Sequence, residues 1–320
     1  MDKAAATVLK IAVGAAILLY LIHFVGIGEL YRTILATKLA YLPLIVAVFI
    51  FSVAMRGLIF KVLLQPHDPF YEKGSIQKQH KKFGLAKLAW ISIVSWAAGM
   101  FTPGKLGEFS SIYLLKKEGL ETGTSAAVSL LNKIITSLTI LAFAIVGLIK
   151  FLGIKDSLQL IVVFAILTLL PYLAITNRKA RELMKKAFGR FLRKHEQHFA
   201  GFVSELDSYM TKRKKLLFYS FLINVAWIAV SSWLFMLAFA AVGQKVGFID
   251  VVLINSIGTT TSFIPVTIGG TGLREASAIV FFGKLGISNA AILGSHIIIA
   301  AVSYTLAGII ATAALLRKGR

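Results

Sequence analysis

Six apolar stretches of this chain each continue for about the length of a membrane span without an acidic or basic side chain. They are centred near residues 19, 49, 140, 167, 230 and 302. A helix needs roughly 17 to 25 such residues to cross the hydrocarbon core of a bilayer. The whole chain is 57% hydrophobic and only 15% charged, whereas about a quarter of a soluble domain is charged. The sequence therefore predicts an all-α polytopic membrane protein.

Two further apolar stretches, residues 88–104 and 251–273, lead into motifs that resemble each other. The first motif contains Pro103, Gly104, Lys105, Gly107 and Glu108. The second contains Gly269, Gly270, Gly272, Arg274 and Glu275. After each glutamate the two segments continue alike, with Ser110 matching Ser277, Ile112 matching Ile279, Lys117 matching Lys284 and Gly119 matching Gly286. We interpret the two segments as a degenerate internal repeat.

Basic residues gather in three places, around residues 73–87, 178–215 and 317–320, and the positive-inside rule assigns all three to the cytoplasm. A full crossing by residues 88–104 would put residues 178–194 outside. The conflict disappears if residues 88–120 form a re-entrant hairpin from the cytoplasmic side and residues 250–287 an inverted one from the outer side. Inverted repeats with broken helices that meet near the midplane are typical of transporters.

The predicted architecture is therefore six full spans plus two re-entrant helical hairpins, in a single transmembrane domain over residues 1–320. We expect a multi-pass protein of the cell membrane whose N- and C-termini are both cytoplasmic.

Residues 177–215 are rich in lysine and arginine, and their apolar residues recur at helical spacing. We expect an amphipathic helix or helix pair on the anionic inner leaflet, and a solvated connecting helix is an equal alternative. The net charge of the chain is +21. Because this charge lies in short loops between apolar spans, anionic lipid is the expected partner and nucleic acid is not.

Glu108 and Glu275 are candidate functional residues, since an acidic side chain inside hydrocarbon costs about 2.5 kcal/mol or more. Lys105 and Arg274 lie close to them in sequence as candidate countercharges. The glycines permit positive φ and close approach of a ligand, and free N–H groups at the following helix starts would suit a lipid phosphate. The alternative is that the glycines allow close helix packing and the glutamates cap helix starts.

Arg56 lies within the second apolar stretch. It is expected either to pair with a hairpin glutamate or attract a phosphate, or to extend its charge to the nearby interface. Asn132 and Lys133 interrupt the fourth apolar stretch with the same ambiguity. Asn224, Asn255 and His296 are single polar residues of the kind that usually bond between helices.

The sequence lacks the residue patterns that are typical of enzyme active sites. The chain has no cysteine, no P-loop, no GxSxG motif and no histidine pair at metal-ligand spacing within a span. We therefore expect no catalytic site, no metal and no cofactor.

The run from Pro103 to Glu108 and the later run from Gly270 to Ala276 resemble the flippase-like transmembrane domain of lysylphosphatidylglycerol synthetases, and the resemblance extends over nearly the whole chain. It implies a prokaryotic cytoplasmic membrane protein. Two-part members join this domain to a cytoplasmic aminoacyltransferase, and we expect a stand-alone member without it. The family commonly has an arginine and an aspartate where this chain has Asn132 and Lys133.

The leading hypothesis is transbilayer movement of a polar or anionic lipid, either a phospholipid or a lipid-linked headgroup, through a cavity between the two hairpins. Arg56 and both motifs would form the binding site. Two alternatives stay open. One is a membrane-embedded transferase acting on a lipid-linked sugar or phosphate. The other is a non-catalytic subunit that recruits a cytoplasmic lipid synthase or glycosyltransferase through residues 177–215.

Overall fold

A computed structural model describes residues 3–65, 83–102, 104–176, 196–264 and 266–318, and this part of the chain contains helices and no strand. The longer helices are α1 (Lys3–Val25), α3 (Leu42–Leu63), α6 (Thr122–Thr176), α10 (Lys214–Ala241) and α13 (Asn289–Lys318). The shorter ones are α2 (Ile27–Leu35), η1 (Leu39–Tyr41), α4 (Leu85–Met100), η2 (Leu106–Phe109), α5 (Ser110–Lys117), α9 (Glu196–Thr211), α11 (Phe248–Thr261) and α12 (Leu273–Gly283).

Five helical segments in the described residues are long and apolar enough to cross a membrane: Val8–Val25, Leu39–Leu63, Thr122–Ile166, Lys214–Ala241 and Asn289–Ala314. The sequence predicted six. The difference arises because the predicted spans near residues 140 and 167 belong to one long helix, α6. The chain is thus all-helical, with several apolar helices of membrane-crossing length.

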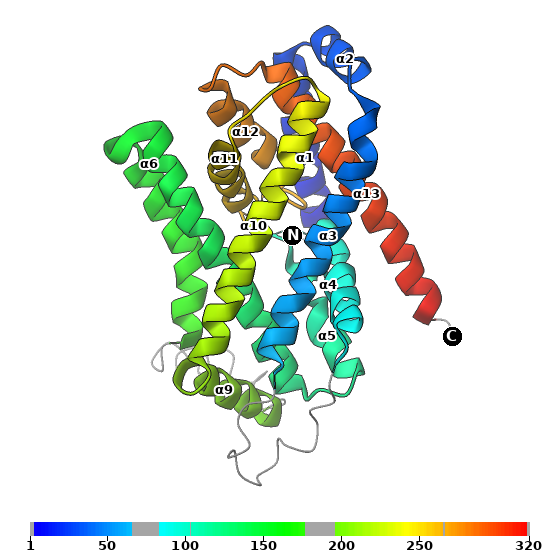
Figure 1. The fold of residues 1–320 in the computed structure, drawn as a ribbon. Coiled ribbons are helices and arrows are strands. Elements are labelled where there is room, and N and C mark those ends of the chain that lie inside the picture. The colour runs from blue at the N-terminus through cyan, green and yellow to red at the C-terminus, as the bar shows by residue number, and fades with distance from the viewer. Residues whose placement is uncertain (1–2, 66–82, 103, 177–195, 265, 319–320) are drawn as a thin grey trace.

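Gly153 bends α6. Its φ of 81° and ψ of 167° are not helical, and side chains disfavour a positive φ of this kind. Figure 1 shows α6 turning back on itself, so that it forms two arms. The first arm ends at this turn, which also carries Lys150 and Phe151.

Helices α4 and α5 form a helix–loop–helix unit whose two ends lie together, because Lys87 Nζ is 2.7 Å from Glu118 Oε2. Helices α11 and α12 form a second unit. Its ends reach the α6 turn, where Asp250 Oδ1 is 2.6 Å from Lys150 Nζ and Lys284 Nζ donates to the Phe151 carbonyl at 3.2 Å. In Figure 1 the first unit occupies the lower half of the molecule and the second the upper half. We call them hairpin 1 and hairpin 2.

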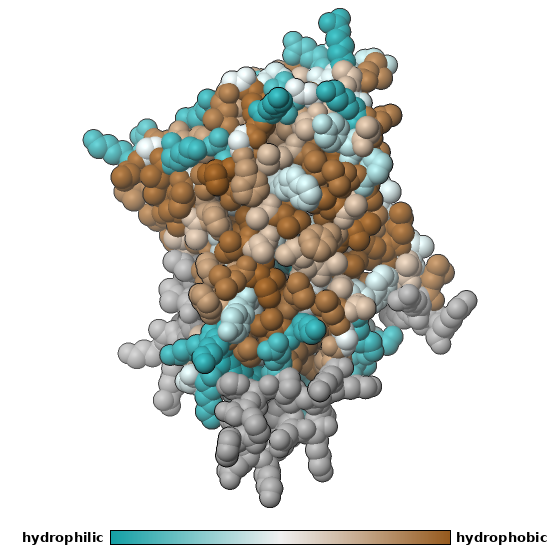
Figure 2. Space-filling view, viewed as in Figure 1, coloured by the Kyte–Doolittle hydropathy of each residue, from teal (hydrophilic) through white to brown (hydrophobic). Residues whose placement is uncertain are grey.

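The buried apolar side chains form two large clusters, one around each hairpin. One joins α10–α13 to the start of α3 and includes Phe239, Ile254 and Phe282; the other joins α4–α6, α9 and the end of α3 and includes Leu63 and Leu115. On the face seen in Figure 2, apolar residues cover the middle and hydrophilic residues gather toward the two ends. An apolar girdle between polar ends is what a bilayer requires.

Helix α9 is the described part of the segment predicted as amphipathic; residues 177–195 lie outside the described residues. Its Leu206 and Tyr209 are buried against α3 and α6, and the Tyr209 hydroxyl donates to the Leu63 carbonyl. Burial raises the pKa of this phenol, so Tyr209 stays a neutral donor. These two side chains therefore contact the bundle rather than lipid.

Candidate functional site

The tips of the two hairpins meet inside the molecule. The Gly269 N–H of hairpin 2 donates to the Thr102 carbonyl of hairpin 1 at 3.4 Å. A Cβ on Gly269 would lie 3.0 Å from the Met100 carbonyl oxygen. The two glycine motifs, more than 160 residues apart in the sequence, thus lie next to each other in the structure.

Gly107 lets the tip of hairpin 1 close. A Cβ there would lie 2.2 Å from the Ala98 carbonyl oxygen, closer than any real contact. The Gly107 N–H donates to Thr102 Oγ1 at 2.6 Å, and this hydroxyl bonds back to the Ala98 carbonyl at 3.3 Å. The close approach at Gly107 is between two segments of the chain, which is the packing role given as the alternative to close approach of a ligand.

Lys105 has a φ of 56° and is the residue other than glycine that adopts a positive φ in the described part of the chain. The left-handed region costs a residue with a side chain roughly 1–2 kcal/mol. Gly104, Gly269, Gly270 and Gly272 also have positive φ, as the sequence predicted for the two motifs. A strained residue among glycines that need no strain is the kind of outlier that marks a functional position.

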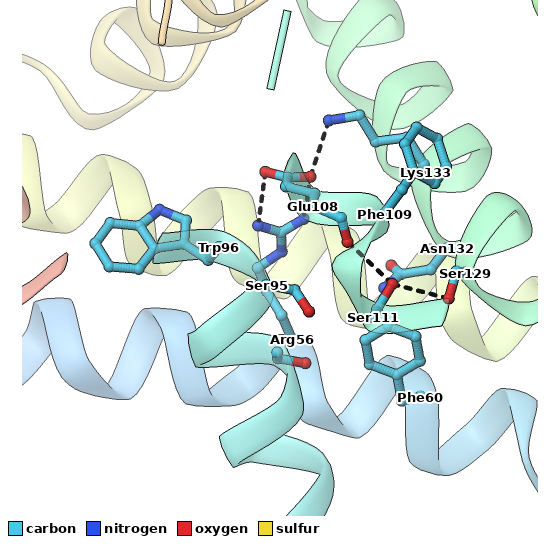
Figure 3. Close-up of a pocket in the computed structure, with 11 residues that line it drawn as sticks. Arg56, Phe60, Ser95, Trp96, Glu108, Phe109, Ser111, Ser129, Asn132 and Lys133 are labelled. Atoms are coloured by element: carbon cyan, nitrogen blue, oxygen red, sulfur yellow. Dashed lines mark hydrogen bonds and ion pairs between the residues drawn. The ribbon is translucent and has the colours of Figure 1, made fainter. Parts of the chain in front are cut away.

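Glu108 is the centre of a three-residue ion cluster (Figure 3). Arg56 of α3 donates to it through both terminal nitrogens, at 3.3 and 3.2 Å, and Lys133 Nζ of α6 lies 2.9 Å from Oε2. The side chain of Glu108 is only 12% exposed. Arg56 therefore contacts a hairpin glutamate, one of the two alternatives left open by the sequence, and Lys133 joins it.

Lys105 makes no direct ion pair within the described residues, so the contacts of Glu108 come from Arg56 and Lys133 instead. Its Nζ lies 6.0 Å from the centre of the Phe263 ring of hairpin 2, and Lys133 Nζ lies 4.9 Å from the same ring. Lys105 precedes η2 with a left-handed backbone conformation, and the contacts of Glu108 come from α3 and α6.

Glu275 is paired locally. Its Oε1 accepts from Arg274 Nε at 3.2 Å and Nη2 at 3.0 Å, and its Oε2 accepts from the Gly272 N–H at 2.7 Å. The predicted pairing with Arg274 is confirmed. The expectation that backbone N–H groups at the helix starts are free for an anion is wrong at Gly272 and at Gly107, because both already donate to side chains.

A small polar cavity of about 20 Å³ lies beside the Glu108 cluster (Figure 3), lined by Arg56, Phe60, Ser92, Ser95, Trp96, Glu108, Phe109, Ser111, Ser129, Asn132 and Lys133. This is room for about one water molecule. The buried Ser92 and Ser95 hydroxyls have no hydrogen-bond partner among the described residues. These two serines were not singled out in the sequence, since a serine in an apolar helix gives no signal of its own.

Of the three single polar residues expected to bond between helices, Asn224 does so. His296 Nδ1 bonds within its own helix, to the Ile292 carbonyl at 3.0 Å, and its Nε2 and Asn255 Nδ2 have no hydrogen-bond partner among the described residues. Thr136 Oγ1 donates to Asn224 Oδ1 and to the Asn132 carbonyl, both at 2.8 Å. Ser111 Oγ donates to Ser129 Oγ at 2.8 Å. No group of three or more histidine, aspartate or glutamate side chains that could hold a metal ion occurs in the described ranges. Pro103 lies outside those ranges.

Comparison with protein families matches residues 7–311 to the family described as the lysylphosphatidylglycerol synthase TM region. The chain belongs to this family. No curated protein matches it in a sequence search. The family resemblance seen in the two glycine motifs is therefore confirmed. A lipid-related role in a membrane is consistent with this membership.

Proposed function

We propose that this chain moves a polar or anionic lipid between the leaflets of the cell membrane through the junction of the two hairpins. One observation carries the proposal: two short helical hairpins approach from opposite ends, and their tips bring four charged side chains together with Arg56 of α3 and Lys133 of α6. Charged groups inside a membrane are costly and mark substrate or ion pathways.

The lengths of α4 and α11 support a re-entrant arrangement. With 16 and 14 residues, they reach about 24 and 21 Å at 1.5 Å per residue, less than the hydrocarbon core of about 30 Å. Non-helical backbone at this depth is tolerated where it is buried in protein or lines a wet cavity. The loops between the helices of each hairpin meet that requirement by packing on each other.

Cysteine labelling tests this topology cleanly, because the chain has no cysteine of its own. We expect Gly84→Cys and Lys116→Cys, before and after the tip of hairpin 1, to react with a membrane-impermeant maleimide only after the cells are permeabilised. Gln244→Cys and Ser288→Cys, which flank hairpin 2, should react in intact cells. Labelling of the two positions of one hairpin from opposite sides would overturn the re-entrant arrangement.

The transport step requires the tips to separate. Among the described residues, the Gly269–Thr102 hydrogen bond joins their backbones, and its 3.4 Å length is long for such a bond. Parting of the tips would expose Lys105 and the Glu108 cluster to a lipid headgroup while the acyl chains stay in lipid. Rocking of the two repeats would alternate the opening between the two faces.

The test is a liposome assay with the purified protein and fluorescent phospholipids of several headgroups, in which dithionite reports the label in the outer leaflet. Glu108→Gln and Glu275→Gln should lose translocation at equal incorporation, because the first leaves Arg56 and Lys133 without their carboxylate and the second leaves Arg274 without its own. Glu118→Gln is the matched control: it makes the same change in an exposed ion pair at the base of hairpin 1.

Loss of translocation in the two tip variants with retention in Glu118→Gln would support the proposal. Failure of the intact protein to move any lipid would overturn it. Equal rates in all three variants would place the translocation path away from the hairpin tips.

A further inference from the structure

Helix α2 is amphipathic and exposes its apolar side. Four apolar residues share that side, which we call the α2 apolar face: Ile27, Tyr31, Ile34 and Leu35. These four residues are 41–68% exposed. The exposed Glu29 and Arg32 lie on the opposite side of the helix. Because contact between apolar surface and water is unfavourable, the α2 apolar face needs a partner.

The contacts of α2 hold it against the ends of two spans. Leu30, at the edge of the apolar face, is buried in the apolar cluster around hairpin 2. A Cβ on Gly294, near the start of α13, would lie 3.2 Å from Thr33 Cγ2. Just after α2, the Lys38 N–H donates to the carbonyl of Ala241, the last residue of α10, at 2.8 Å. The packed edge of α2 therefore fixes its position, and the apolar face remains outside this contact.

This position lies at the boundary of the membrane-spanning part. Four of the five segments of membrane-crossing length end or begin beside α2, at Val25, Leu39, Ala241 and Asn289. Gly26, with a φ of 89°, separates α2 from α1, and Figure 1 places α2 at the same end of the molecule as the base of hairpin 2. The nine residues of α2 measure about 14 Å. The helix is thus too short to cross a hydrocarbon core of about 30 Å.

Exposed apolar residues continue on both sides of α2 in the chain. Phe24, in the last turn of α1, is 57% exposed, and Leu39 of η1 is 72% exposed. The α2 apolar face therefore extends the apolar surface of the neighbouring spans. Acyl chains that surround those spans would reach this face without a gap.

We propose that α2 lies in the plane of the membrane at the hairpin 2 end, in the outer leaflet under the proposed topology, with its apolar face among the acyl chains. Glu29 and Arg32 then face water. Tyr31 suits this boundary, since its ring is apolar and its hydroxyl polar. The single acid and the single base of α2 cancel, so apolar area and not anionic lipid drives the contact. The inference does not depend on lipid transport.

The experiment places a nitroxide at single cysteines along α2 in liposomes of phosphatidylcholine, since the chain has no cysteine of its own. Collisions with oxygen report acyl chains, and collisions with water-soluble nickel ethylenediaminediacetate report water. We expect high oxygen and low nickel accessibility at positions 27, 31, 34 and 35, corresponding to a depth of about 5–10 Å. Glu29→Cys and Arg32→Cys are the matched controls on the same helix, and their labels should show the reverse.

A second measurement avoids the spin label. Tyr31→Trp adds fluorescence that brominated acyl chains should quench, whereas Arg32→Trp adds fluorescence that iodide should quench. Both spectra are compared with that of the intact protein, whose four tryptophans form a common background. Both positions are exposed, so neither change removes a buried contact.

The outcomes are distinct. Nickel accessibility at positions 31 and 35 equal to that at positions 29 and 32 would put the apolar face in water and overturn the proposal. Low accessibility to both reagents at positions 31 and 35 would show that protein covers this face, which also overturns it. Insertion that occurs only when phosphatidylglycerol is added would overturn the uncharged contact. None of these results changes with the rate at which the protein moves lipid.

Discussion

Gly107→Ala is the sharpest test of how hairpin 1 is built. The added Cβ would lie 2.2 Å from the Ala98 carbonyl oxygen, 2.4 Å from its carbon and 2.8 Å from the Gly99 nitrogen. Reaching an ordinary contact of 3.4 Å requires a separation of about 1.2 Å between η2 and α4. Overpacking costs about 1–3 kcal/mol. Because every atom in the way belongs to the backbone, we expect the upper end of this range.

The assay is thermal unfolding of the purified protein in detergent. A cost of about 3 kcal/mol corresponds to a Tm lower by about 6 °C, at roughly 2 °C per kcal/mol for a chain longer than 150 residues. Gly84→Ala is the matched control, since its φ is −62° and a Cβ there meets nothing within 4 Å; its Tm should not fall. A Tm of Gly107→Ala within 1 °C of the original would refute the close contact between η2 and α4.

Three further predictions use the same measurement. Glu108→Gln should lower stability by about 3–5 kcal/mol because it leaves two buried cations unpaired, and adding Lys133→Gln should recover part of that loss. Arg213→Gln should have a similar cost, because Arg213 Nη1 lies 2.7 Å from Oε1 of Glu205, which is only 4% exposed and would be left without its cation. The double variant Arg213→Gln/Glu205→Gln should lose less stability than Arg213→Gln alone. Tyr209→Phe should cost about 1–3 kcal/mol, since it removes the phenol that donates to the buried Leu63 carbonyl; an unchanged Tm would contradict that bond.

The helical character and the two hairpin segments were predictable because composition and the distribution of charge can be recognised in short stretches of the sequence. The two apolar stretches, residues 88–104 and 251–273, are long enough to cross a bilayer, so the re-entrant interpretation came from the positions of the basic residues and not from length. The sequence predicted six spans, whereas the described residues contain five helical segments of membrane-crossing length, because the two arms that meet at Gly153 belong to one helix, α6.

The partners of Glu108 were only partly predictable. Arg56 was a candidate because a guanidinium within an apolar stretch needs a counterion. Choosing it and Lys133 over Lys105 requires the packing of α3 and α6 on hairpin 1, which no local pattern encodes. Phe263, which faces two of the cations, gave no signal either, because phenylalanine is common throughout an apolar chain.

The first arm of α6 connects the base of hairpin 1 to the base of hairpin 2. It begins at residue 122, four positions after the ion pair that closes the base of hairpin 1, and ends at the turn where hairpin 2 is anchored through Lys150 and Phe151. Residues 122–152 of this arm measure about 46 Å as a helix. Lys133, on the same rod, contacts Glu108 between those two bases. If the first arm of α6 tilts about the Lys133–Glu108 contact, the bases of hairpin 1 and hairpin 2 move in opposite directions. An opening beside one hairpin then widens at one face of the molecule while the opening at the other face narrows.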